Sequence, residues 1–155
     1  MSAVVAAVVR DAIVQTTAIT SLVGSGSSAR VYASYRPSTA LPCIVLTYGS
    51  DQDLSPTLAR TDRLRRMSVQ VECIGATLAA SRVLAEEVRE ALHGAKGVNR
   101  STTIIEIRVT SVQTEYDFGQ EATDDQVHIT TVSAEVTYRS PAVNPTFIVD
   151  PNAQP

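Results

Sequence analysis

The stretch from Arg65 to Gly94, RRMSVQVECIGATLAASRVLAEEVREALHG, changes its hydrophobic period at a single glycine, Gly75. Before this glycine, apolar residues alternate with polar ones, which is typical of a strand with one covered face. The apolar members are Met67, Val69, Val71 and Cys73. After it, Thr77 is a good N-cap and the apolar residues follow at helical spacing. The stretch therefore predicts a strand that turns into a helix.

The predicted helix runs from Thr77 to His93, and Gly94 is well placed to end it. Its apolar side carries Ala80, Leu84, Val88 and Leu92, and its solvated side carries Arg82, Glu86, Arg89 and Glu90. Such a helix needs a sheet or another helix against its apolar side.

The rest of the chain supplies further elements. Residues 3–16 form an amphipathic pattern that Val4 and Ala7 widen, so we expect this helix to be covered from more than one side. A short helical turn follows and stops at Gly24–Ser28. CIVLTYGS, residues 43–50, is rich in β-branched and aromatic residues and predicts a central strand. We expect residues 51–66 to form a charged loop.

Two long strands are predicted at 103–117 and 126–140, separated by a polar loop. Each changes its alternation midway. Ile105, Ile107 and Val109 give way to Val112 and Tyr116, and Val127 and Ile129 give way to Val132, Ala134, Val136 and Tyr138. A β-bulge, or a strand that passes from one core to a neighbouring one, would produce this change.

This order of elements predicts an α+β fold with an antiparallel sheet of about four strands and two main helices on one face. The length of 155 residues suits one domain, which we expect over residues 1–139. Residues 140–155 hold four of the seven prolines and predict an extended C-terminal arm.

No catalytic, cofactor or metal site is expected. Gly75 stands alone, without the further glycines or the lysine of a phosphate-binding turn. His93 and His128 lack metal-ligand spacing, and no serine lies in a Gly-x-Ser-x-Gly elbow. Cys43 and Cys73 fit buried apolar positions, with a disulfide or a reactive thiol as the alternative.

Charge and hydropathy exclude other partners. Thirteen Lys and Arg against sixteen Asp and Glu give a net charge of -3, which is too mild and too dispersed for a nucleic-acid footprint. The apolar N-terminus is interrupted by Arg10 and Asp11 and fits neither a secretion signal nor a membrane span. We therefore expect no membrane partner.

Two segments are better suited to protein-protein contact. The first is the charged loop, with Arg60, Arg63, Arg65 and Arg66, because arginine forms directional bonds and is enriched at interfaces; a plain surface loop is the alternative. The second is the arm, whose Phe147, Ile148 and Val149 would be exposed unless a neighbour covers them.

Several motifs together resemble the tail-terminator, or tail-completion, proteins of long-tailed phages and gene transfer agents. They are the Leu-Val-Gly end of the first helix, Arg-Val-Tyr before a proline-marked strand, the alternating SVQVECIGAT, and the helix LAEEVREAL. The resemblance covers roughly residues 3–139, and the longer arm after Arg139 departs from it.

The resemblance implies a non-enzymatic subunit of a ring, usually hexameric, at the head-proximal end of a virion tail that is assembled in the host cytoplasm. Such a ring ends polymerisation of the tail tube and joins the neck proteins of the head, while DNA passes through its lumen without sequence-specific binding. The family has no catalytic residues to carry over. Another neck or head-completion adaptor and a host cytosolic enzyme are the alternatives.

Overall fold

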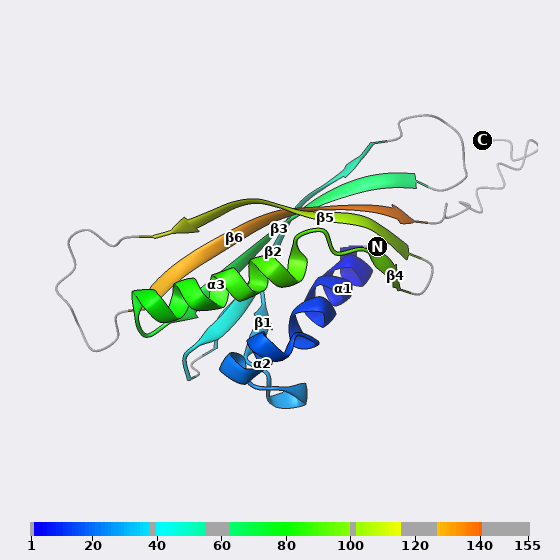
Figure 1. Cartoon of the computed structure of the whole chain (residues 1–155). Coiled ribbons are helices and arrows are strands. Elements are labelled where there is room, and N and C mark those ends of the chain that lie inside the picture. The colour runs from blue at the N-terminus through cyan, green and yellow to red at the C-terminus, as the bar shows by residue number, and fades with distance from the viewer. Residues whose placement is uncertain (1, 38–39, 55–62, 100–101, 116–126, 141–155) are drawn as a thin grey trace, which may run out of the picture.

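The computed structural model describes residues 2–37, 40–54, 63–99, 102–115 and 127–140 (Figure 1). The helices are α1 (Ser2–Val14), α2 (Thr17–Val23) and α3 (Leu78–Leu92), with a 3₁₀ turn at Gly26–Ser28. The strands are β1 (Val31–Ala33), β2 (Cys43–Asp53), β3 (Arg63–Gly75), β4 (Gly97–Asn99), β5 (Thr102–Thr114) and β6 (His128–Ser140). The α+β class is therefore confirmed.

The sheet has six strands in the order β1-β2-β3-β6-β5-β4. β1 runs parallel to β2 and all other neighbours are antiparallel, so the sheet is mixed. This corrects the expected sheet of about four antiparallel strands and two main helices. β1 and β4 span three residues each, which is too short to show a period of two. β2 lies beside the short edge strand β1, and the central pair is β3 and β6.

All three helices share one core with one face of the sheet, as Figure 1 shows. β3 contributes the four predicted residues Met67, Val69, Val71 and Cys73, all buried. β6 contributes Val132, Ala134, Val136 and Tyr138, and the helices contribute Val5, Val9, Ile13, Ile19, Leu84, Val88 and Leu92. We call the opposite side of the sheet the helix-free face.

The two long strands change their alternation for different reasons. β5 has irregularities between Ile104 and Glu106 and between Val109 and Ser111, which confirms a bulge. The bulge buries Ile104 and leaves Ile105 40% exposed, contrary to the expectation for Ile105. β6 pairs with β3 without a break. Its residue Ile129 joins a second small apolar cluster on the helix-free face, whose buried members are Cys43, Val45 and Ile74.

Both ends of the expected charged loop belong to strands. β2 continues to Asp53 and β3 begins at Arg63, with Gln52 opposite Arg66 and Asp53 opposite Arg65. The prediction was wrong here because cross-strand pairing stabilises charged residues in strands when opposite charges face each other. Residues 55–62 lie outside the described part of the chain.

Candidate interface surfaces

The structure divides the predicted arginine cluster. Arg60 lies outside the described residues, and Arg63 begins β3 but its side chain is not described. Arg65 and Arg66 are consecutive in β3, so their side chains point to opposite faces of the sheet. Arg65 lies opposite Tyr138 on the helix-covered face, and Arg66 lies on the helix-free face. The predicted arm residues Phe147, Ile148 and Val149 are outside the described part of the chain.

Arg65 belongs to a polar network at one end of the core. Its Nη2 lies 3.3 Å from Oδ2 of Asp51. The hydroxyl of Tyr138 donates to the same carboxylate and lies 2.9 and 2.8 Å from its two oxygens. Burial, together with the hydrogen bond to Asp51 and its charge, raises the pKa of Tyr138 to about 12. The phenol therefore stays a donor at neutral pH, and Arg65 is paired inside the subunit.

Arg66 belongs to a charge cluster on the helix-free face. Its Nε lies 3.9 Å from Oε2 of Glu135, and Nη2 of Arg108 lies 3.2 Å from the same oxygen. A polar hollow of about 90 Å³ beside it is lined by Ser50, Gln52, Arg66, Ser68 and Glu135. Exposed ion pairs stabilise a fold by at most about 1 kcal/mol. The cluster orients polar groups on this face and offers a partner both hydrogen-bond donors and acceptors.

The outer edge of β2 is covered at one end and open at the other. β1 covers residues 44–46, where Ile44 N donates to Arg30 O and Ser34 N donates to Leu46 O. In a strand every second residue bonds to the same side, so Ile44 and Leu46 are followed on the outer side by Tyr48 and, after a bulge, by Asp51. Tyr48 lies opposite Val69, and Asp51 lies opposite Met67. Their N-H groups therefore point away from β3, and no described residue bonds to them.

The outer edge of β5 is also half covered. Ile107 N donates to Ala95 O, and Val109 N donates to Nδ1 of His93 at 3.2 Å. Ile107, Val109 and Val112 lie opposite Val136, Ala134 and Val132, which are alternate residues of β6. The N-H of Val112 therefore points away from β6, as those of Ile107 and Val109 do. Among the described residues none bonds to this N-H. Val112 is also 39% exposed, which marks this end of β5 as an open edge.

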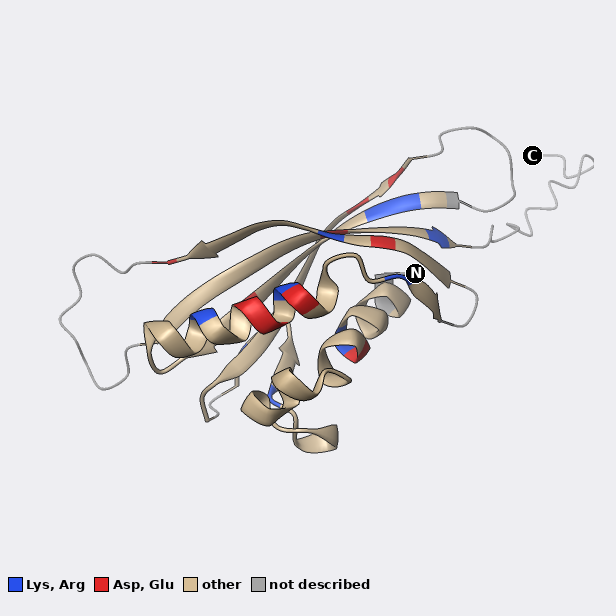
Figure 2. Ribbon diagram, viewed as in Figure 1, with Lys and Arg blue, Asp and Glu red and all other residues tan. Residues whose placement is uncertain are grey.

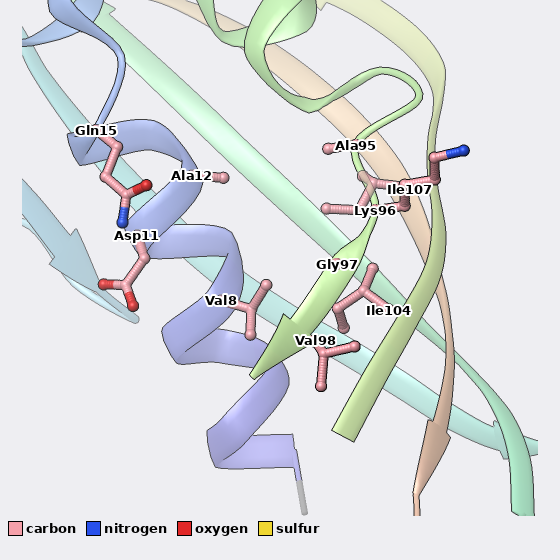
Figure 3. Close-up of a pocket in the computed structure, with 10 residues that line it drawn as sticks. All are labelled: Val8, Asp11, Ala12, Gln15, Ala95, Lys96, Gly97, Val98, Ile104 and Ile107. Carbon is pink, nitrogen blue, oxygen red and sulfur yellow. The ribbon is translucent and has the colours of Figure 1, made fainter. Parts of the chain in front are cut away.

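A groove lies between α1 and β4 (Figure 3). Its volume is about 220 Å³, and its lining is Val8, Asp11, Ala12, Gln15, Ala95, Lys96, Gly97, Val98, Ile104 and Ile107. Asp11 comes from α1 and Gln15 directly follows it, whereas Lys96 comes from the segment between α3 and β4. The apolar lining and the few polar groups suit an apolar side chain better than an enzymatic substrate.

The turn between β3 and α3 leaves no space for a phosphate. A Cβ added to Gly75 would lie 2.7 Å from Ser81 N and 3.0 Å from the Ala80 Cβ. This glycine therefore permits close packing of the strand end against the first turn of α3. Thr77 accepts a hydrogen bond from Ala80 N at 3.1 Å, which confirms the predicted N-cap.

The other candidate residues have structural surroundings as well. Cys43 and Cys73 are both free and buried, and they point to opposite faces of the sheet because Ile44, not Cys43, lies opposite Cys73. Burial raises the pKa of the Cys43 thiol and raises that of Cys73 still more, so neither is an activated thiolate. His93 follows the last residue of α3 and accepts the hydrogen bond from Val109 N. Within the described ranges no three His, Cys, Asp or Glu residues are grouped as metal ligands.

Charge and hydropathy along the folded chain agree with these surroundings. Figure 2 shows acidic and basic positions interleaved along α3 and both signs on the strands. In the part of the chain that the structure describes, no single helix is long and apolar enough to cross a membrane. Val4–Val14 and Thr17–Val23 reach the required length and composition only as a pair bent by 87°. Their apolar residues Val5, Val9, Ile13, Ile19 and Val23 are buried in the core.

The open edges, the charge cluster and the groove are surfaces suited to contacts with other proteins, and comparisons with known proteins give the class of protein. The family model described as Tail completion protein gp17 matches residues 7–135. No curated protein matches the chain in sequence. A chain in the solved structure titled "Virion of native gene transfer agent (GTA) particle" is similar in fold, with a TM-score of 0.63 and 14% identity. The match covers 90% of this chain and 97% of that one.

The chain belongs to the tail completion family. It is a structural tail or neck protein of the virion and not an enzyme. Three features were missed from the sequence: the open strand edges, the groove and the Asp51–Tyr138 contact. Asp51 and Tyr138 are 87 residues apart, and no local pattern signals such a pair.

Proposed function

We propose that this protein is the tail terminator of its particle. It forms a ring, of six subunits, that caps the tail tube at its head-proximal end and stops the tube from growing. The free side of the ring then joins the neck proteins of the head, and DNA passes through the lumen. Membership of the tail completion family supports this role, and the fold likeness supports the architecture of the subunit.

The observation that carries the ring is the position of the two open edges. β2 is open from Tyr48 onward, at the end of the sheet where β3 has Met67 and Val69. β5 is open at Val112, whose row includes Val132 and Val71. The open halves thus lie toward opposite lateral edges of the sheet and at opposite ends of its strands.

This arrangement supports head-to-tail pairing. If the open half of β2 pairs with the open half of β5 in the next subunit, each subunit uses two different patches, as a closed ring requires. Because the open halves are diagonal to each other, the joined strands are staggered. Staggered strands are inclined to the axis of a closed assembly, as they are in β-barrels.

The β5 edge provides a sharp test. Val112→Pro removes the outward N-H, whereas Val112→Thr keeps it at the same position with a similar shape. We expect the Thr variant to form the oligomer of the unaltered protein and the Pro variant to remain monomeric with an unchanged circular dichroism spectrum. Native mass measurement, with and without tail tube, checks this. A Pro variant that forms the full oligomer would contradict the β5 contact.

Particle assembly distinguishes a terminator from another neck adaptor. Without a terminator the tail tubes should exceed their normal length, because nothing stops polymerisation. Without an adaptor the tubes should have normal length and fail to join heads. Electron microscopy of tubes made in the absence of this protein measures the difference, and tubes of normal length would exclude the terminator role.

A further inference from the structure

The groove between α1 and β4 is suited to binding a short apolar segment. Val8, Ala12, Ile104 and Ile107 line it with apolar groups, and Val98 beside it is 72% exposed (Figure 3). Gly97 lies opposite Ile104 in the β4–β5 pair, so a side chain at Gly97 would point to the same side as Ile104. A Cβ there would meet no atom within 4 Å, so the space is open.

We propose that this groove holds the apolar triplet Phe147, Ile148 and Val149 of the same chain. The proposal goes beyond the ring and does not depend on it. It assigns an occupant to the groove. It also gives a binding surface to three consecutive large apolar side chains that would otherwise be exposed.

The place where the described chain ends puts the triplet within reach. Arg139 lies opposite Thr103, and Thr103 lies opposite Val98, so the three residues form one row across β6, β5 and β4. This row spans about 10 Å, given the usual spacing of strands. The seven residues that follow Ser140, up to Phe147, can span up to about 23 Å when extended. A tether this short also gives the chain's own arm a local concentration in the millimolar range, which favours it over a second copy.

The chemistry of the triplet matches the groove. Pro145 and Pro151 flank it and favour extended backbone at the residues that precede them. In an extended segment Phe147 and Val149 point to the same side and can enter the groove together. Asp150 follows directly, and Lys96 beside the groove makes no ion pair with any residue that the structure describes. The charges therefore complement each other.

Tryptophan fluorescence tests the proposal, because the natural chain has no Trp. In the full-length Phe147→Trp protein we expect emission that is shifted to the blue relative to the denatured protein and is protected from acrylamide. Adding Gly97→Val should fill the groove and return the emission to the position of exposed tryptophan. Valine suits this strand position, because Gly97 is not among the residues with positive φ. Lys96→Glu is a second, surface variant and should weaken the blue shift most at low salt.

Measuring the emission of the Phe147→Trp protein over a series of protein concentrations identifies the occupant of the groove. A blue shift that is independent of protein concentration supports the chain's own triplet. A shift seen only at concentrations where the protein oligomerises would assign the groove to the arm of a second copy and overturn the proposal. Emission typical of exposed tryptophan throughout, or a blue shift that neither Gly97→Val nor Lys96→Glu alters, would overturn it too. None of these outcomes bears on Val112 or the ring.

Discussion

The hydroxyl of Tyr138 connects three strands at one end of the core. Tyr138 is fully buried on β6, its hydroxyl donates to Asp51 on β2, and Asp51 is paired with Arg65 on β3. The Asp51 side chain is only 20% exposed, so water replaces a lost donor there incompletely. The network thus fixes the end of β2, including part of its open edge, to β3 and β6.

Replacing Tyr138 with Phe should lower the free energy of unfolding by about 1–3 kcal/mol, as for other hydrogen bonds to charged groups. Because the pKa of Tyr138 is raised from 10 to about 12, the folded state favours the protonated phenol. The contribution is therefore present below pH 10 and is lost as the pH rises toward about 12. Chemical denaturation at neutral and at alkaline pH measures both effects. Tyr35→Phe is the control, because Tyr35 is 71% exposed and should leave stability unchanged.

The junction of β3 and α3 shows how two elements depend on one glycine. Both elements were predicted from their periods, and the structure adds the reason for the turn: the first turn of α3 packs directly on Gly75. Since the nearest obstacle is the backbone nitrogen of Ser81, the helix itself would have to move to make room for a side chain.

Gly75→Ala should therefore destabilise the fold by about 1–3 kcal/mol, which is usual for an overpacked site. Gly97→Ala is the matched control, because its Cβ would meet open space and the change restricts the unfolded chain. We expect the control to have equal or slightly higher stability in thermal and urea unfolding. Equal stability of both variants would show that α3 can shift without cost.

At the scale of the whole molecule, the domain boundary at residue 139 and the role of the arm remain predictions. β6 continues to Ser140, which is buried and lies opposite Arg63, so a truncation is better placed after Ser140 than before it. The described strands and helices then stay intact, and only residues 141–155 are removed.

We expect the truncated protein to unfold cooperatively and to be weaker in ring formation or in joining heads to tails, because loss of the arm leaves the apolar groove between α1 and β4 uncovered and removes the outer residues of the arm from the subunit surface. Sedimentation and a head-tail joining assay check the two functions, and circular dichroism checks the fold. A truncated protein with the normal oligomer mass and normal joining would show that the arm is dispensable for assembly.

The sequence by itself determined the elements whose signals are local. The alternation in β3, the apolar stripe of α3 and the Thr77 cap each depend on residues a few positions apart, and all three predictions were confirmed. The bulge in β5 was also visible as a break in alternation, although its exact register was not. The motifs in these same segments were sufficient to identify the tail completion family.

Only the tertiary structure decided which residues meet across the sheet. Register brings Asp51 to Tyr138 and turns Arg65 and Arg66 to opposite faces, and the short strands β1 and β4 exist because longer neighbours offer them an edge. The open halves of β2 and β5 follow from where those short strands stop. These features depend on pairing between residues far apart in the chain, and a local hydrophobic period carries no information about such pairing.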